Sequence, residues 1–284
     1  MHAPDQFDLM QEAVDTAKDA DAVILIVGTN SDWETEGNDR SSLALPSNQD
    51  ELVQKICSAN NNTVVVLNTG SPCEMPWIDE ANSILQCWFP GQEFGNSLSD
   101  ILFGSVNPSG KLPTTFPKKL SDTPAYSTYP GKDLQMDYEE GLFIGYRWYD
   151  RENIEPLFAF GHGLSYTNFE YSNLRAVPPK NESSVAAFEL EVINKGKLYG
   201  KEIVQGYIKV KESNIERPVK ELKKFEKIGL EPEESKKIKF ELSERDLSYW
   251  SEKDQCWKVE PAEYIFEVGS SAKEIKDSAS VWLG

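Results

Sequence analysis

The run Ala22-Val23-Ile24-Leu25-Ile26-Val27, closed by Gly28, decides the fold of the first part of this chain. Consecutive apolar residues rich in Val and Ile predict a strand that is covered on both faces, as strands of parallel sheets are. Residues 63–67 and 83–89 form further apolar runs, and segments with helical periodicity lie between the runs. Because helix and strand alternate over about 100 residues, the sequence predicts an α/β fold with a parallel sheet.

The helices expected around these strands follow from apolar spacing and from their end signals. An apolar stripe predicts a helix over 7–18, and Ser47-Asn48-Gln49-Asp50 resembles a capping box that opens a helix ending near Ser58. Further helical pieces are expected over 77–80 and 92–103. Open α/β sheets bind ligands at the carboxyl ends of their strands, so the loop after Gly28 is a candidate ligand loop.

The second half of the chain has a different pattern. Prolines and aromatic residues crowd residues 105–168, which predicts a long loop-rich segment that must pack against something. Alternating apolar and polar residues then predict strands over 188–193, 204–210, 237–242 and 262–268. Several short alternating strands within about 110 residues indicate an all-β sandwich.

Charge supports a division of the chain. Residues 1–170 carry 9 basic and 26 acidic side chains, net −17, whereas residues 171–284 carry 20 and 21, net −1. We therefore expect three parts. They are an α/β domain over 1–117, a loop-rich connector over 118–168 that packs between domains, and a β-sandwich over 169–284.

Composition excludes several function classes. The chain has 29 Lys+Arg against 47 Asp+Glu, net −18, and such a field repels nucleic acid and anionic membranes. No apolar run approaches the ~18 residues of a membrane span. The start at Met1 lacks the features of a signal peptide, so a cytoplasmic location is the default expectation, with secretion open if a further N-terminal part exists.

Metal and cofactor chemistry is not expected either. The chain has only two histidines, His2 and His162, and four cysteines without C-x-x-C spacing. That supply of ligands argues against a zinc site and against a Ser-His-Asp or Cys-His centre. The sequence therefore predicts neither a metal nor a cofactor.

Ser31-Asp32-Trp33-Glu34-Thr35-Glu36-Gly37-Asn38-Asp39-Arg40, the loop after the first strand, is the densest polar segment. Hydrolysis of a glycosidic bond needs a carboxylic acid that protonates the leaving oxygen, with its pKa raised enough to hold the proton near neutral pH. Neighbouring carboxylates and an aromatic wall both raise the pKa of a carboxyl group. From these residues alone, an exposed acidic turn is the simpler interpretation.

Several motifs in a fixed order resemble family 3 glycoside hydrolases of the β-glucosidase type. They lie at residues 25–30, 34–40, 45–46, 88–93, 102–104, 107–113, 138–141, 145–147 and 160–166. Residues 216–223 resemble the fibronectin-III-like domain of that family. The resemblance runs through nearly the whole chain.

The resemblance implies a layout and an activity. In that family an N-terminal TIM barrel supplies an Asp nucleophile, an α/β sandwich supplies an acid/base Glu, and a fibronectin-like domain often follows. This chain resembles the last portion only, the later part of the α/β sandwich with the fibronectin-like domain. The expected function is retaining, exo-acting hydrolysis of a β-linked oligosaccharide or glucoside, with the nucleophile on a barrel in cis or in trans. The alternative is a non-catalytic scaffold or binding fragment.

By its place before Gly37, Glu36 matches the acid/base of the family, and Glu34 is the second candidate. Trp33 is a candidate for stacking on a sugar, and Asp39 and Arg40 are expected to form an ion pair that braces the loop. Ser31-Asp32-Trp33 looks like the signature around the nucleophile, but its surroundings match the acid/base loop, so we treat it as coincidence. We expect the isolated chain to be inactive and, with part of its sheet bare, prone to self-association.

Overall fold

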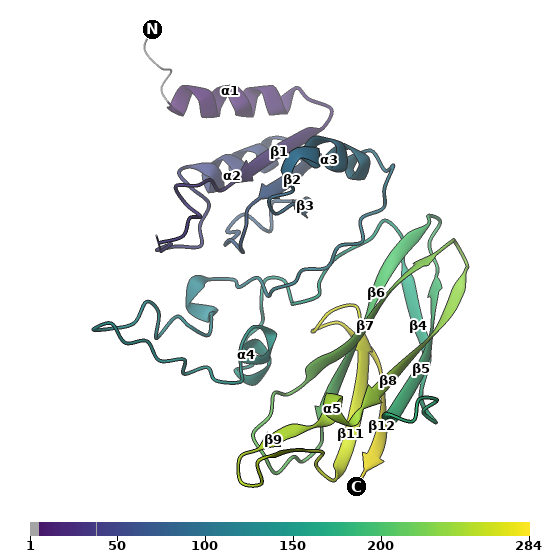
Figure 1. Ribbon diagram of the computed structural model, residues 1–284. Helices are drawn as coiled ribbons and strands as arrows, with labels where there is room; N and C mark the ends of the chain where they lie inside the picture. The colour runs from purple at the N-terminus through teal and green to yellow at the C-terminus, as the bar shows by residue number, and fades with distance from the viewer. Residues whose placement is uncertain (1–5, 38) are drawn as a thin grey trace. The chain divides into compact units, whose positions relative to one another are not determined.

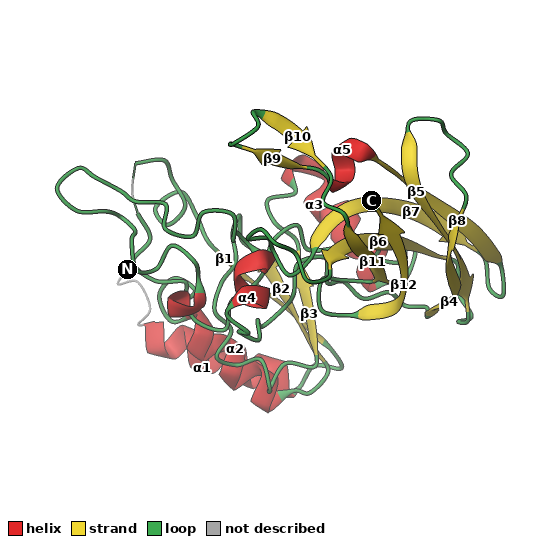
Figure 2. Ribbon diagram, turned by 90° about the horizontal axis from the view of Figure 1, so that it is seen from below, coloured by secondary structure: helices red, strands yellow, loops and turns green. Residues whose placement is uncertain are grey.

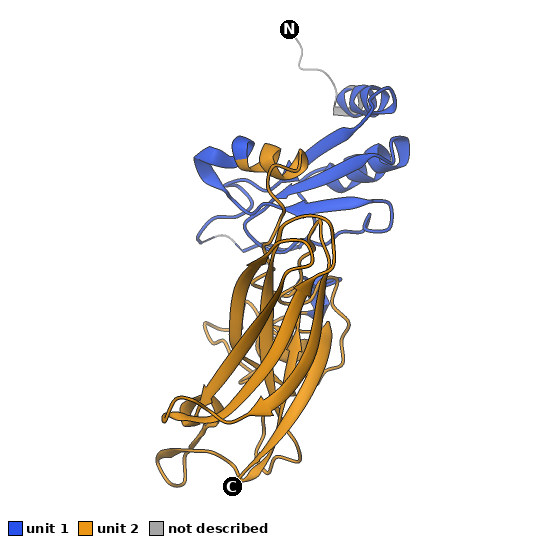
Figure 3. Ribbon diagram, turned by 90° about the vertical axis from the view of Figure 1, so that its right-hand side faces the viewer, with its two compact units in different colours: residues 1–96, 116–122 blue, residues 97–115, 123–284 orange. Residues whose placement is uncertain are grey.

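The computed structural model describes residues 6–37 and 39–284. The first residues, which lack the features of a signal peptide, lie outside the described residues. Two compact units are present, one of residues 1–96 and 116–122 and the other of residues 97–115 and 123–284 (Figure 3). Among the described residues, no helix is both long and apolar enough to cross a membrane.

A three-stranded parallel sheet forms the centre of the first unit (Figure 1). Its strands are β1 (Val23–Gly28), β2 (Thr63–Asn68) and β3 (Ser83–Gln86), in the order β1-β2-β3. The register places Val23 opposite Thr63 and Val64 opposite Ser83. The predicted α/β fold with a parallel sheet is confirmed.

Helices α1 (Gln6–Lys18) and α2 (Gln49–Ala59) cover one face of this sheet (Figure 2). The residues of this small core are Val14, Ala17 and Ile56, with Ala13, Val23, Leu25, Leu52 and Ala59 packed against them. Since successive side chains of a strand point to opposite faces, Ile24 and Ile26 of β1 point away from the helices.

The capping box expected at Ser47 is wrong, although the helix begins where it was predicted. Asn48 is the N-cap residue of α2, and its side chain makes no capping hydrogen bond. The Asp50 carboxylate instead accepts hydrogen bonds from the Leu45 backbone N–H (3.2 Å) and the Trp77 indole (2.8 Å). A capping box would require the Asp50 carboxylate to accept a hydrogen bond from the backbone at the start of the helix. This carboxylate instead binds the preceding loop and the buried Trp77.

Two other local predictions also differ from the structure. Residues 76–80 form turns, with the Ile78 and Glu80 N–H groups donating to the carbonyls of Met75 and Trp77, rather than a helix. Strand β3 ends at Gln86 instead of residue 89, because the chain turns there and Trp88 has a φ of 56°. The helix expected over 92–103 is present as a 3₁₀ turn (Gly91–Glu93) followed by α3 (Phe94–Leu102).

The second unit is built around two antiparallel sheets (Figure 1). One has the order β4 (Phe169–Val177), β5 (Ser184–Asn194), β8 (Ser235–Ser243). The other has the order β12 (Ile275–Leu283), β11 (Ala262–Gly269), β6 (Gly200–Val210), β7 (Glu221–Leu230). The expected all-β sandwich is confirmed, and the four predicted strands correspond to β5, β6, β8 and β11.

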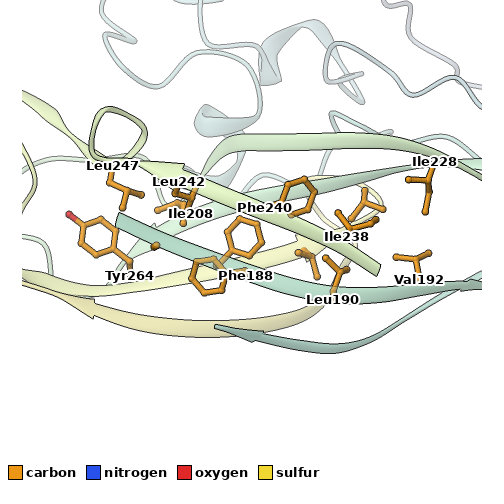
Figure 4. Packing of buried hydrophobic residues seen from close by; sticks show 14 of the residues in the cluster. Phe188, Leu190, Val192, Ile208, Ile228, Ile238, Phe240, Leu242, Leu247 and Tyr264 are labelled. Atoms are coloured by element: carbon orange, nitrogen blue, oxygen red, sulfur yellow. The ribbon is translucent and has the colours of Figure 1, made fainter. Parts of the chain in front are cut away.

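A single apolar core lies between these two sheets (Figure 4). Its members are residues 186, 188, 190, 192, 204, 208, 228, 230, 238, 240, 242, 247, 262, 264, 266 and 268. Phe188 and Phe266 stack with ring centroids 4.5 Å apart and an interplanar angle of 12°. Alternating residues of strands from both sheets supply this core, which explains the alternation in the sequence.

The remaining short elements of this unit are α4 (Tyr146–Arg151), α5 (Glu244–Leu247), β9 (Tyr249–Ser251) and β10 (Cys256–Lys258), whereas the 3₁₀ turn η2 (Leu120–Asp122) belongs to the first unit. The loop-rich segment packs on β6, as expected of a segment with so many aromatic residues. Gln205 donates to the carbonyl of Gly161 (3.1 Å), and the rings of Tyr146 and Tyr207 meet edge to face. Lys111 forms a nearly buried ion pair with Glu202 (3.0 Å).

Candidate functional site

The loop after β1 is anchored through Glu34. Its Oε1 accepts hydrogen bonds from the Thr29 hydroxyl (2.5 Å) and from the Gly70 backbone N–H (3.1 Å), and it lies 3.9 Å from Arg40 Nη1. The Glu34 side chain is only 15% exposed. A carboxylate with a hydroxyl, an amide and a guanidinium around it is held in one place, so Glu34 fixes the course of this loop.

The start of the loop is fixed by Gly28 at the end of β1. A Cβ atom at this position would collide with the carbonyl oxygen of Asn68 on β2, so only glycine allows this close approach. The Gln49 side chain accepts a hydrogen bond from the Gly28 N–H (2.7 Å) and donates one to its carbonyl (2.9 Å). The loop therefore leaves the sheet from a backbone position that α2 and β2 both define.

The turn of residues 69–71 after β2 forms the other side of the site. Arg40 Nη1 donates to Ser71 Oγ (2.6 Å), and Gln86 Nε2 donates to the carbonyl of Thr69 (3.1 Å). A Cβ on Gly70 would lie 2.5 Å from both Glu34 Oε2 and Phe89 Cε2. The half-exposed ring of Phe89 therefore lies against this turn, beside the anchored carboxylate.

Several buried polar atoms in this region have no hydrogen-bond partner among the described residues. They are Trp33 Nε1, Arg40 Nε and Nη2, Asn68 Oδ1 and Gln86 Oε1. Buried polar groups are normally paired with protein or with water, because an unpaired one costs free energy. The carboxyl edge of the sheet thus carries unpaired hydrogen-bond donors and acceptors, which is typical of a region that binds a ligand.

Glu36 differs sharply from Glu34, two residues earlier. Its side chain is exposed, and it makes no hydrogen bond or ion pair with the described part of the chain. Gly37, which follows it, has a φ of 86°, a conformation that favours glycine. The turn at Gly37 leaves Glu36 at the surface of the loop.

The other predicted residues of the loop fall into two groups. Arg40 is brought together with Glu34 and Ser71, and Trp33 is half-buried. Asp32 and Asp39 are exposed, and Asn38 of the motif lies outside the described residues. The ion pair that braces the loop in this structure joins Arg40 to Glu34. The expected ion pair between Asp39 and Arg40 stays a prediction.

Sequence reasoning missed Phe89 and the turn that its ring covers. The apolar run over 83–89 predicts a strand that ends at Phe89, but no pattern in the sequence places this ring against Gly70. One feature of the sequence does indicate this position. Phe89 stands beside Pro90-Gly91 at the carboxyl end of a predicted parallel strand, where ligands bind in open α/β sheets.

Metal-ligating side chains do not cluster in the described part of the chain. Within residues 6–37 and 39–284, no group of three or more His, Cys, Asp or Glu side chains could hold a metal ion. His162 lies in the second unit and stacks on Phe158, and burial followed by the nearby Lys111 charge lowers its pKa. Burial raises the pKa of the Cys73 thiol to about 12, so this cysteine is not an activated nucleophile.

The chain thus combines a parallel α/β unit, which has a carboxylate-rich loop at its strand ends, with an antiparallel β-sandwich. Residues 6–166 match the family profile described as the glycosyl hydrolase family 3 C-terminal domain, and residues 202–272 match a fibronectin type III-like domain. The chain belongs to glycosyl hydrolase family 3.

Relatives with this arrangement are β-glucosidases by name. The chain is 46% identical over 276 residues to thermostable beta-glucosidase B of Acetivibrio thermocellus and 47% identical over 264 residues to a putative beta-glucosidase of Schizosaccharomyces pombe. These matches cover 96% and 93% of this chain but only 36% and 31% of the relatives. The chain therefore spans about a third of the length of these relatives.

Solved structures agree over the whole chain. The beta-glucosidase of Kluyveromyces marxianus superposes with a TM-score of 0.94 at 39% identity, covering 100% of this chain and 33% of that one. A Bifidobacterium adolescentis GH3 beta-glucosidase superposes with a TM-score of 0.93 at 40% identity, covering 42% of that chain. Both units thus have counterparts in these enzymes.

Proposed function

We propose that this chain supplies the general acid/base of a retaining β-glucosidase and that Glu36 is this residue. The observation that carries the proposal is the contrast within one loop, where Glu34 is fixed by three neighbours and Glu36 is left free at the surface. A carboxyl that must give and take a proton needs access to the glycosidic oxygen and to water. Glu34 has the features of a brace, and Glu36 has this access.

The proposed mechanism has two steps. Glu36 first donates its proton to the leaving oxygen, while an Asp on a TIM barrel attacks the anomeric carbon and forms a glycosyl ester. Glu36, now a carboxylate, then removes a proton from the water that releases the sugar and restores the Asp. The nucleophile and most of the sugar pocket would come from a barrel that this chain does not contain.

Aromatic rings at the sheet edge suit the proposed substrate, a β-linked oligosaccharide or glucoside. Trp33 is half-buried in the same loop, and the Phe89 ring is half-exposed beside Gly70. Rings of this kind can stack on the apolar face of a sugar. The unpaired donors of Arg40 would lie beside it.

A second candidate function is a scaffold or binding portion without catalytic work of its own. The exposure of Glu36 fits this alternative as well, because an exposed carboxylate needs no catalytic role. The two candidates differ in one respect. Only the first requires Glu36 for turnover once a barrel is present.

The test is a chimera in which this chain replaces the matching 276 residues of the Acetivibrio thermocellus β-glucosidase B. We expect Glu36→Ala to lower kcat about 10²- to 10⁴-fold on a glucoside with a poor leaving group. The loss should be smaller on an aryl glucoside with a good leaving group, which needs less protonation. Azide should restore turnover by attacking the glycosyl ester in place of activated water.

Asp32→Asn and Glu34→Ala are the matched controls. Neither should respond to azide, and Asp32→Asn should retain most of the turnover. Full activity of Glu36→Ala in the chimera would exclude the acid/base role, and azide rescue of Glu34→Ala alone would move the role to Glu34. The isolated chain should show no β-glucosidase turnover, with or without these substitutions.

A further inference from the structure

Two tryptophans lie at the surface of a short hairpin in the second unit. In the described chain, β9 and β10 form a sheet of their own and place Trp250 directly opposite Trp257 (Figure 2). The two residues are 44% and 48% exposed, and their rings meet edge to face with centroids 5.4 Å apart. Because tryptophan is highly buried on average, an exposed pair indicates a surface where something binds.

Arg245 of α5 adds a cation to this pair of rings. Its guanidinium carbon lies 3.1 Å from the centre of the Trp257 ring, so the group packs on the face of the indole. Arg245 is exposed, and within the described chain its side chain makes no hydrogen bond or ion pair. A guanidinium that stacks through its face keeps its N–H groups for other acceptors. Arg245 therefore holds unused donors beside the two indoles.

The hairpin that carries the tryptophans is held in one shape. Asp254 in its turn accepts a hydrogen bond from the Ser251 hydroxyl (2.7 Å) and forms an ion pair with Lys258 (2.6 Å). The guanidinium of Arg217 lies 5.2 Å from the centre of the Tyr249 ring, on the face of the hairpin opposite to the two tryptophans. The two indoles are therefore positioned before anything binds, which lowers the entropic cost of binding.

Charge around the hairpin is balanced. Residues 244–258 carry four acidic and three basic side chains. Asp246 pairs with Lys224 and Asp254 pairs with Lys258, which leaves two acidic and two basic side chains in this segment. A surface without net charge attracts neither a polyanion nor a polycation. The aromatic rings and the unused donors therefore suit a neutral ligand that has many hydroxyl groups.

We propose that Arg245, Trp250 and Trp257 form a sugar-binding site on the β-sandwich, and that its ligand is a chain of β-linked glucose units. A β-linked glucose carries its hydroxyl groups around the rim of the ring and C–H groups on both faces. One face stacks on an exposed indole, and the hydroxyl oxygens at the rim accept hydrogen bonds from Arg245. The inference rests on the proposed function, because the choice of β-linked glucose follows from the proposed substrate.

Titration of the isolated chain with defined tetrasaccharides tests the site without any need for activity. Cellotetraose or laminaritetraose, which have β-1,4 and β-1,3 linkages, should give a saturable calorimetric isotherm and change the tryptophan fluorescence. Maltotetraose, the α-1,4-linked isomer, should bind at least about tenfold more weakly, because its linkages turn successive ring faces out of one plane. Equal affinity for maltotetraose, or no saturable binding of either β-linked ligand at millimolar concentrations, would overturn the proposal.

Substitutions assign the binding to this cluster. Trp257→Ala and Arg245→Gln should each weaken the binding about tenfold, since one removes a ring and the other removes the cation and its donors. Trp257→Tyr keeps a ring and should retain most of the affinity, even if Trp257→Ala disturbs the hairpin. The matched control Trp282→Ala removes an exposed indole of β12 and should leave the affinity unchanged. Unchanged binding in Arg245→Gln, or equal losses in Trp257→Ala and Trp282→Ala, would contradict the site.

The outcomes are separable from those of the proposed function. Glu36→Ala in the isolated chain should leave the binding of the β-linked tetrasaccharides unchanged. Absent binding together with a chimera whose turnover depends on Glu36 would contradict the sugar site but not the acid/base role. Sedimentation provides a last check, because a homodimer that Trp257→Ala converts to monomer and that binds no sugar would assign the surface to a second copy and contradict the proposal.

Discussion

Glu34 Oε1 accepts a hydrogen bond from the Gly70 N–H across 3.1 Å, which joins the loop after β1 to the turn after β2. These residues are 36 positions apart in the chain. The bond makes one carboxylate of the acidic loop part of the framework. The next carboxylate, Glu36, is exposed and does not belong to this framework.

Glu34→Ala should destabilise the first unit by about 1–3 kcal/mol, because the Gly70 N–H and the Arg40 guanidinium lose a part-buried acceptor. Glu36→Ala should change the free energy of unfolding by less than about 0.5 kcal/mol, since exposed side chains contribute little. Hydrogen exchange of the β1 and β2 amides under mild denaturant measures both values. Equal effects of the two substitutions would contradict the division of roles.

Gly70→Ala should also be destabilising, by about 1–3 kcal/mol, since the new methyl group would press on Glu34 Oε2 and on the Phe89 ring. The matched control is Gly95→Ala in α3, where a Cβ meets nothing within 4 Å. Alanine favours a helix over glycine by up to about 1 kcal/mol, so this control should be neutral or stabilising. Thermal unfolding of the two variants should therefore show shifts of opposite sign or clearly different size.

Glu241 should make the second unit sensitive to acid. The hydrogen bond from Lys239, followed by that from the Lys180 N–H, lowers the pKa of this carboxyl from 4.5 to about 2. Because the folded state releases the proton more readily than the unfolded state, the stabilisation is complete above pH 4.5 and is lost as the pH falls toward 2. Thermal unfolding between pH 6 and 2 should show a smaller loss for Glu241→Gln than for the unchanged chain.

If the melting temperatures of Glu241→Gln and of the unchanged chain fall equally between pH 6 and 2, the acid sensitivity belongs to other carboxylates. Lys239→Met offers a second check, because it removes the largest cause of the lowered pKa while leaving the N–H groups of Lys180 and Asn181 in place. Its acid sensitivity should lie between those of the unchanged chain and of Glu241→Gln.

Phe266→Ala should destabilise the β-sandwich by about 3–5 kcal/mol, since the ring is fully buried and stacks on Phe188. Trp282→Ala on β12 provides a control of similar type, because this side chain is 68% exposed and should cost much less. Urea unfolding followed by circular dichroism compares the two. A cost for Phe266→Ala as small as that for Trp282→Ala would mean that the ring does not belong to the core.

The strands of the sandwich that were missed all lie at sheet edges. Strands β5, β6 and β11 lie inside a sheet and carry a regular alternation of apolar residues, and the edge strand β8 was predicted because it alternates as well. In β4, β7 and β12 polar or charged residues interrupt the apolar alternation, so the sequence did not reveal these strands. Edge strands pack against fewer neighbours and are under weaker demand for apolar side chains.

The sequence by itself determined the α/β-then-β organisation, the parallel sheet, the candidate acidic loop and the family to which its motifs point. These follow from local periodicity and from short motifs, which the chain carries in its own order. The tertiary structure decided which carboxylate is held and which is exposed, because Glu34 is distinguished from Glu36 by its contacts with Thr29, Gly70 and Arg40. It also placed β1 at an open edge, since neighbours in a sheet come from segments that are distant in sequence and leave no mark on the strand itself.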